Sequence, residues 1–245
     1  MMKHLAIAAV VTGFAAAHAA DPQEVWERTI EAKGGRERLR SVHSLAIFMK
    51  PAEVKAAGAD FRGRAANWLC VFPDRYFEFD GAGVGGSQRA TVVDGTADRA
   101  ATDATGIPRN ARHLSASERD RLALNQIVFL LESAWLQPKA IEVRHNVLTV
   151  EAAGRTYKLF LDHANLPERI LSPAVPGQTP KIAYDYRLQH YRDFQGLQLP
   201  ARVVRIEGIR EAVWDVDYEI DAKYNPKLFE RMPDLANGPE PWRMR

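Results

Sequence analysis

Histidines, carboxylates and glycines are the residues of this chain that could support catalysis or metal binding, but their spacing favours neither. The histidines of the chain body (His43, His113, His145, His163 and His190) stand singly, without a His-x-x-x-His pair or a neighbouring cysteine, so no metal site is predicted. No Gly-x-Ser-x-Gly motif occurs, and no carboxylate spacing marks an acid and base pair. The sequence therefore indicates no catalytic residue and no cofactor.

One glycine string resembles a dinucleotide-binding fingerprint. Gly81-x-Gly83-x-x-Gly86 follows a predicted strand, as that fingerprint requires. The segment after it, Gln88 to Val93, has the pattern of a strand and not of a helix, and a phosphate site needs the helix N-terminus. We therefore interpret the string as a glycine-rich loop.

The single cysteine and the charge balance restrict the function further. Cys70 cannot form an intramolecular disulfide, and its apolar strand, shared with Trp68, predicts a buried thiol with a packing role. The 33 basic and 31 acidic residues alternate along the chain, so no nucleic-acid partner and no anionic membrane surface is predicted. The densest basic group, Arg36 to Arg40, is interrupted by Glu37 and predicts a solvated turn.

The first twenty residues match a secretory signal peptide. A basic start at Lys3 precedes an apolar run from Leu5 to Ala17, which is too short to span a bilayer, and small residues flank the expected cleavage site at Ala19 or Ala20. We expect residues 1–20 to be removed and the product to be a periplasmic protein, with a secreted protein as the alternative. No cysteine for lipid attachment lies at the cleavage region, and no transmembrane anchor is predicted.

Two helices are expected. The first begins at Asp21, a capping residue followed by Pro22, and ends at Gly34-Gly35, with Val25, Trp26 and Ile30 on its buried face. The second runs from Ser115, which begins a capping box, to Gln137, before Pro138. Its apolar stripe consists of Leu124, Ile127, Val128, Leu131, Ala134 and Trp135, and predicts a helix that lies against an apolar surface and covers the sheet.

The remainder of the chain reads as short strands with tight links. The segments predicted as strands are Val42 to Met49, Ala65 to Phe72, Arg75 to Phe79, Ala90 to Val93, Ile141 to Val150, Thr156 to Leu161, Glu168 to Leu171, Ile182 to Tyr191, Gln198 to Glu207 and Ala212 to Ile220. Hairpin-type links leave no room for crossover helices, so the sequence predicts a strongly curved antiparallel meander of roughly ten strands.

These elements, in this order, resemble the LolA-like family and its broader branch of outer-membrane lipoprotein-sorting-like proteins. The first half of the resemblance is the segment Trp68 to Tyr76 followed by Val93-Asp94-Gly95-Thr96 and an apolar helix. The second half is Tyr157-x-Leu159-x-Leu161-Asp162, then Leu166-Pro167-x-Arg169-Ile170, then Tyr191-x-Asp193-x-x-Gly196-x-x-Leu199-Pro200. The resemblance covers nearly the whole expected mature chain, and its motifs indicate a fold more than an activity.

The resemblance implies an α+β fold, in which a half-open barrel is covered by an N-terminal helix and a central apolar helix around an apolar cavity. The cavity and lid candidates are Trp68, Cys70, Phe72, Leu124, Ile127, Val128, Leu131 and Trp135, with Val203 or Val204 on a neighbouring strand. Two positions depart from the family. Phe72 stands where the carriers have an arginine that helps lock the lid, and Ala97-Asp98-Arg99 replaces an aromatic cluster.

The expected organisation is one domain over residues 21–232, followed by a Pro-rich tail at 233–245. The leading hypothesis is a carrier or binding protein for a hydrophobic small molecule, a lipid or a lipoprotein acyl chain. The second is an interaction or assembly module for an envelope membrane-protein complex. The third is an enzyme whose residues come together from distant strands.

Overall fold

The computed structural model describes residues 20–52, 65–80, 89–104, 107–108, 112–172, 184–207 and 210–230. The predicted signal peptide, except Ala20, the glycine string and the Pro-rich tail lie outside these residues. Within the described residues, no helix is both long enough and apolar enough to cross a membrane.

The N-terminal helix α1 (Pro22–Lys33) begins and ends where its capping residues predict. The Asp21 side chain accepts a hydrogen bond from the Gln23 amide at 2.9 Å, and Gly34 ends the helix with φ 127°. A Cβ at Gly34 would lie 2.3 Å from the carbonyl oxygen of Gly196, so only glycine fits there. A short helix, α2 (Arg36–Arg40), follows where a solvated turn was predicted.

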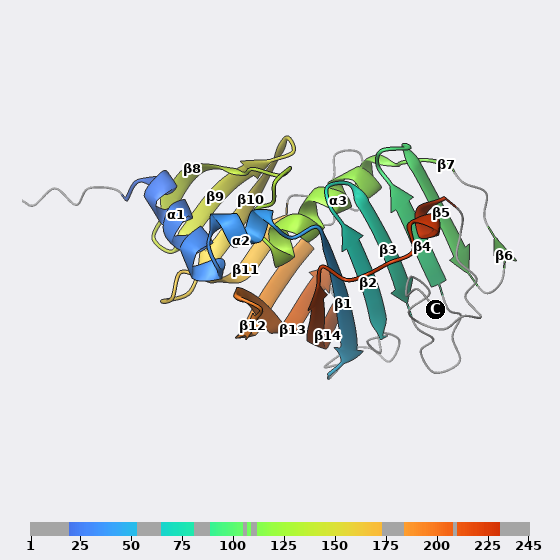
Figure 1. The fold of residues 1–245 in the computed structure, drawn as a ribbon. Helices are drawn as coiled ribbons and strands as arrows, with labels where there is room; N and C mark the ends of the chain where they lie inside the picture. Colours follow the sequence, from blue (N-terminus) through green and yellow to red (C-terminus); the bar gives the residue numbers. More distant parts are fainter. Residues whose placement is uncertain are drawn as a thin grey trace, which may run out of the picture.

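The strands form one antiparallel sheet, which is fourteen-stranded over the described residues. Its first meander contains β1 (Ser44–Pro51), β2 (Ala66–Val71), β3 (Arg75–Asp80), β4 (Arg89–Asp94), β5 (Arg99–Ala104), β6 (Ile107–Pro108) and β7 (Arg112–His113). Its second contains β8 (Lys139–Arg144), β9 (Val147–Ala152), β10 (Arg155–Leu161), β11 (Pro167–Ser172), β12 (Tyr184–Phe194), β13 (Leu197–Glu207) and β14 (Arg210–Ile220). Pairing of β1 with β14 joins the two meanders, and the sheet does not close (Figure 1).

Two details of the predicted strands were wrong. The expected single strand from Ile141 to Val150 is a hairpin of β8 and β9, because His145 adopts φ 56° and turns the chain. The short strands β5, β6 and β7 were not predicted. Their segments, such as Arg99–Ala104, are rich in alanine and polar residues, and they owe their extended form to pairing with β4 and with each other.

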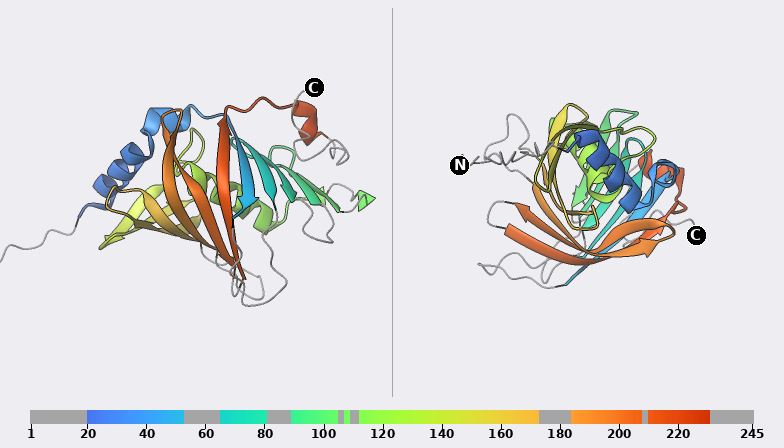
Figure 2. Two further views of the ribbon diagram at one scale, coloured as in Figure 1. Left: turned by 90° about the horizontal axis from the view of Figure 1, so that it is seen from below. Right: turned by 90° about the vertical axis from the view of Figure 1, so that its left-hand side faces the viewer.

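The helix α3 (Ala116–Phe129) connects the two meanders and must cross the sheet to do so. The first meander ends with β6 and β7 at one side of the sheet, whereas the second begins with β8 at the opposite edge. Seen end-on, the sheet curls around α1 and α3 (Figure 2). The topology thus places α3 inside the concave face, and the predicted α+β half-open barrel with covering helices is confirmed.

Helix α3 is shorter than the prediction of Ser115 to Gln137. Its start is the predicted capping box between Ser115 and Glu118. It ends at Phe129 because Leu131 adopts φ 67°, with its amide donating to the Gln126 carbonyl at 2.9 Å. The residues beyond Leu131 therefore leave the helical stripe.

The sheet near β1 to β4 is apolar on both faces. Leu45, Trp68, Cys70 and Tyr76 belong to the main core on the concave side, and the alternate residues form a second cluster on the convex side. That second cluster is Ala46, Leu69, Val71, Phe77, Phe79, Ala90 and Val92 with Ala222, Leu228 and Phe229. The last two come from η1 (Pro226–Phe229), so the C-terminal segment covers the outer face there (Figure 1).

Candidate functional site

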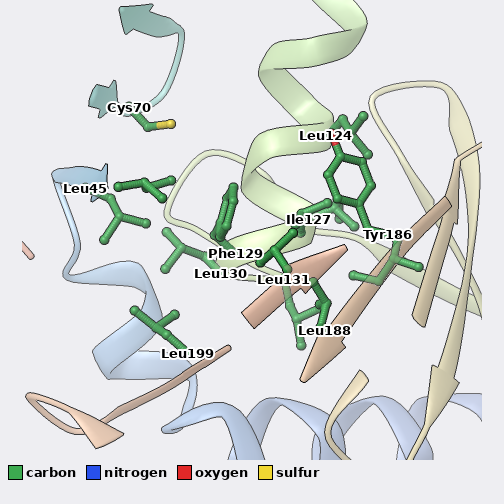
Figure 3. Packing of buried hydrophobic residues seen from close by; sticks show 14 of the residues in the cluster. Leu45, Cys70, Leu124, Ile127, Phe129, Leu130, Leu131, Tyr186, Leu188 and Leu199 are labelled. Carbon is green, nitrogen blue, oxygen red and sulfur yellow. The ribbon is translucent and has the colours of Figure 1, made fainter. Parts of the chain in front are cut away.

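The candidate site is the concave face of the half-barrel, which α3 occupies. Trp68 and Cys70 of β2, and Phe72 just after it, point to this face by strand alternation, and Leu124, Ile127, Val128 and Leu131 reach it from α3 and the turn after it. All of these side chains are buried in the main core. Figure 3 shows residues of α3 and the following turn in one buried cluster with Leu45 of β1, Cys70 of β2, Tyr186 and Leu188 of β12 and Leu199 of β13.

Trp135, predicted on the same stripe, lies elsewhere because the helix ends before it. Its side chain is 48% exposed, and its ring meets the edge of His43 with the ring centroids 6.2 Å apart. Of the two valines proposed as partners on a neighbouring strand, Val203 lies in the main core, opposite Trp214. Val204 is buried at the alternate position of the same strand.

Aromatic side chains pack α3 tightly against the sheet. Phe129, at the end of the helix, contacts Trp68 and Tyr218 edge-on, with ring centroids 6.1 Å apart in each case. Beside Cys70 and Phe72, the space between β2 and α3 is reduced to a void of about 10 Å³. This void is about large enough for one water molecule, so the part of the concave face beside Cys70 and Phe72 is filled by the protein's own helix.

A buried ion pair fastens the middle of α3 to strand β3. Arg121 donates to the Glu78 carboxylate at 2.8 Å, and its guanidinium lies 5.2 Å from the Trp68 ring and 5.9 Å from the Tyr76 ring. Burial opposes the charge on Arg121, but the Glu78 carboxylate and the neighbouring tyrosine hydroxyls together raise the arginine pKa above its ordinary value. Arg121 therefore stays charged in this contact.

A second ionic cluster holds the turn that follows α3. The Glu132 side chain has no exposed surface and accepts hydrogen bonds from Arg36 and, at 2.7 Å, from Arg40 Nε. Arg36 also pairs with Glu27 of α1 at 2.7 Å. This latch, defined as Glu132 with Arg36 and Arg40, ties the end of α3 to α2, and two of its members belong to the segment predicted as a solvated turn.

Further polar contacts hold the helix along its length. The Gln126 side chain donates to the Pro73 carbonyl at 2.8 Å and accepts from the Ser133 hydroxyl at 2.6 Å. Asp120 pairs with Arg155 of β10 at 3.1 Å. Helix α3 is thus held against both meanders by hydrogen bonds and ion pairs.

Buried hydrogen-bonding atoms without a partner within the described residues are Trp68 Nε1, Lys33 Nζ and Arg155 Nε, the last in a guanidinium that pairs with Asp120 through another nitrogen. Lys33 is the last residue of α1, and its Nζ lies 4.9 Å from the centre of the Tyr191 ring. Burial lowers the pKa of Lys33 to about 7, and it raises the pKa of the neutral Cys70 thiol to about 12.

A cavity lies between β11 and β12, where the two strands separate. Its volume is about 420 Å³, and it is lined by Asp162, Glu168, Arg169, Arg187, Leu188, Gln189, His190 and Tyr191. Backbone pairing of the two strands runs from Ser172 with Tyr184 to Arg169 with Arg187, whereas β12 continues to Phe194. No group of three or more metal-ligating side chains is found among the described residues.

Sequence reasoning missed the polar residues of this site because each depends on a distant partner. Glu132 and Arg36 are far apart in the chain, and no local pattern links them. Lys33 did carry a signal. It follows Thr29 and Ile30 at helical spacing, on the same face as Val25 and Trp26, so it occupies a core position in α1.

Comparison with known proteins identifies the fold. No known protein family and no curated protein is matched by this sequence. Among solved structures, a LolA superfamily protein from Nitrosomonas europaea is similar with a TM-score of 0.54 and 15% identity, over 87% of this chain and 99% of that chain. A DUF1329 family protein from Desulfovibrio piger is similar with a TM-score of 0.51 and 10% identity, over 86% and 98%.

These two similarities extend over most of each chain, but at low identity, so they concern the fold and not the activity. The chain has a LolA-like fold, as the strand and turn motifs predicted.

Proposed function

We propose that the protein is an exported carrier or binding protein for a hydrophobic ligand, such as a lipid or a lipoprotein acyl chain, in the periplasm. The ligand takes the place of α3 on the concave face, so α3 acts as a plug that ligand binding displaces. The observation that carries this proposal is an apolar wall on the concave face that, from β1 to β3, is covered by one connecting helix, α3. The proposal assigns no catalytic role to any residue and no cofactor.

Such an exchange replaces one set of apolar contacts with another. An acyl chain gains about 0.8 kcal/mol for each methylene that it buries. Leu124, Ile127 and Val128 of α3 contribute comparable apolar surface to the wall, so a long chain can replace their contacts. The latch at Glu132 and the Arg121–Glu78 pair then set the free energy that the ligand must overcome.

The filled concave face also favours a second candidate function. With a void of about 10 Å³ at Cys70 and Phe72, the structure has no open acyl-chain cavity beside these residues. A LolA-like fold that keeps α3 in place would serve as an interaction or assembly module in the envelope, and it would present its outer surface to a membrane-protein complex.

Extraction and uptake separate the two candidates. Organic extraction and mass spectrometry of the protein purified from periplasm should yield co-purifying lipid if the carrier proposal holds. The purified protein should also take up a fluorescent fatty acid, and Glu132→Gln should take it up faster, because the variant weakens the latch on the plug.

Glu142→Gln is the matched control, since Glu142 forms an exposed pair with Arg144 at 2.6 Å on the edge strand β8 and makes no contact with the latch arginines among those described. It should take up the probe at the wild-type rate. Protein that contains no lipid and takes up no probe, in either the wild type or Glu132→Gln, would favour the envelope module.

A further inference from the structure

Lys33 carries a buried amine that takes no part in the hydrogen bonds and ion pairs described above for α3. Its side chain is fully buried, and Nζ lacks a hydrogen-bond partner within the described residues. An unpaired polar group at a core position costs stability, whereas methionine would fill similar space without that cost. The last turn of a helix does favour a cation, but Lys33 is buried among apolar residues instead of facing solvent.

The Tyr191 ring lies against this amine, and Tyr218 in turn interacts electrostatically with Tyr191. The Tyr191 hydroxyl donates to the Pro167 carbonyl, and the Tyr218 hydroxyl donates to the Pro200 carbonyl, each at 2.7 Å. Burial raises the pKa of both hydroxyls well above the ordinary value of 10.0.

Two carboxylates in this part of the molecule are already engaged. Glu132 is held by the latch arginines, and Asp162 accepts from the amides of Ala164 and Leu166 in its own turn. Desolvation alone lowers the pKa of Lys33, with no charged neighbour contributing. The amine is therefore available to an anion that comes from outside the chain.

The Tyr191 ring connects this amine both to the core and to the surface. Lys33 Nζ lies over the ring, and the ring packs against the main core that α3 fills. Tyr191 also lines the cavity of about 420 Å³ between β11 and β12, together with Leu188 of the main core. A head group at Lys33 would thus lie between an opening at the surface and the apolar wall of the half-barrel.

We propose that Lys33 is the anchor for the carboxylate of a single-chain acidic amphiphile, a free fatty acid, whose chain occupies the concave face. This inference rests on the proposed carrier function and names its ligand class. A carboxylate at Nζ supplies the missing hydrogen-bond partner, and an ion pair of this kind is strengthened in a water-poor core.

Binding of the acid has a defined proton balance. At pH 8 much of the Lys33 population is the neutral amine, because burial lowers its pKa to about 7. The arriving carboxylate favours the ammonium form, so the amine takes one proton from the buffer as the ion pair forms. A neutral ester of the same chain length forms no ion pair and takes up no proton.

The test compares dansylaminoundecanoic acid with its methyl ester at pH 8, by fluorescence titration and by calorimetry in two buffers of different ionisation enthalpy. The wild type should bind the acid about tenfold more tightly than the ester, a difference of ~1.4 kcal/mol, and should take up protons with the acid alone. Lys33→Met should bind both probes with the affinity of the ester and take up no proton. Lys158→Met, which removes an exposed lysine of β10, should behave as the wild type.

The outcomes separate the two proposals. Equal binding of acid and ester by the wild type, or an acid preference that survives in Lys33→Met, overturns the anchor while leaving the carrier function in place. Failure of the wild type to bind either probe overturns both. Circular dichroism and the melting temperature of Lys33→Met verify that the variant is folded.

Discussion

Lys33 shows how one residue can couple the stability of this fold to pH. Its pKa is lowered by desolvation from 10.5 to about 7 in the folded protein. Between these values the unfolded chain holds a proton that the folded chain lacks, so raising the pH through this window stabilises the folded state. Below about pH 7 both states are protonated, and the stabilisation is lost.

We expect the free energy of unfolding of the wild type to rise relative to that of Lys33→Met by about 1 kcal/mol per pH unit from pH 7 to pH 10. The neighbouring tyrosine hydroxyls stay neutral over most of this range because burial raises their pKa values. Urea denaturation at a series of pH values measures the difference. Parallel curves for the two proteins would show that Lys33 is not desolvated in solution.

The buried carboxylate of Glu132 gives a second prediction for a single residue. Glu132→Gln keeps the shape of the side chain but removes the charge that Arg36 and Arg40 share. The loss should cost ~2–4 kcal/mol, because two arginines lose their common counter-ion beside a fully buried group. Chemical denaturation of the variant measures this cost, and Glu142→Gln should leave the stability unchanged. If Glu132→Gln changed the free energy of unfolding as little as Glu142→Gln does, the latch would not stabilise the fold.

At the scale of elements, the proposed carrier function requires α3 to leave the concave face. Cys70 reports its position, since it lies on β2 facing a void of about 10 Å³ that Leu122, Asn125 and Gln126 of α3 also line. Displacement of the helix would expose the thiol, and the docked helix hides it.

The native protein should therefore react with a bulky aromatic disulfide reagent at least about a hundredfold more slowly than the denatured chain. Burial, which raises the thiol pKa to about 12, adds to this protection. Glu132→Gln should accelerate the reaction without unfolding the protein. A fast reaction of the wild type, measured by absorbance, would mean that α3 does not cover β2 in solution.

For the whole molecule, the sheet is stabilised from both sides around β1 to β4. Helix α3 packs on the concave face, while Leu228 and Phe229 of η1 pack on Leu69, Phe77 and other residues of the convex face. The guanidinium of Arg75 lies 5.6 Å from the centre of the Phe229 ring, and Arg99 donates to the Phe229 carbonyl. The short helix η1 is thus part of the core.

Phe229→Ala should lower the free energy of unfolding by about 3 kcal/mol, because it removes a buried ring and leaves a cavity on the outer face. Lys227→Ala, at an exposed position of the same short helix, should have no measurable effect. Thermal and urea denaturation measure both. If both variants were as stable as the wild type, the segment would not pack on the sheet.

The sequence by itself determined the local elements and the class of fold. Asp21 with Gly34 predicted the bounds of α1, Ser115 with Glu118 predicted the start of α3, and the short links predicted an antiparallel meander. These features depend on capping and turn preferences of residues that are close in the chain, so a single sequence contains them.

The tertiary structure decided what the concave face contains and which charges meet there. The end of α3 at Phe129 depends on the turn at Leu131 and on the latch between Glu132 and the distant Arg36 and Arg40. The exposure of Trp135 follows from that early end. The isolation of the Lys33 amine depends on strands that fold over α1 from the other end of the chain. Contacts of this kind join residues far apart in sequence, and their energies depend on burial, which only the folded chain creates.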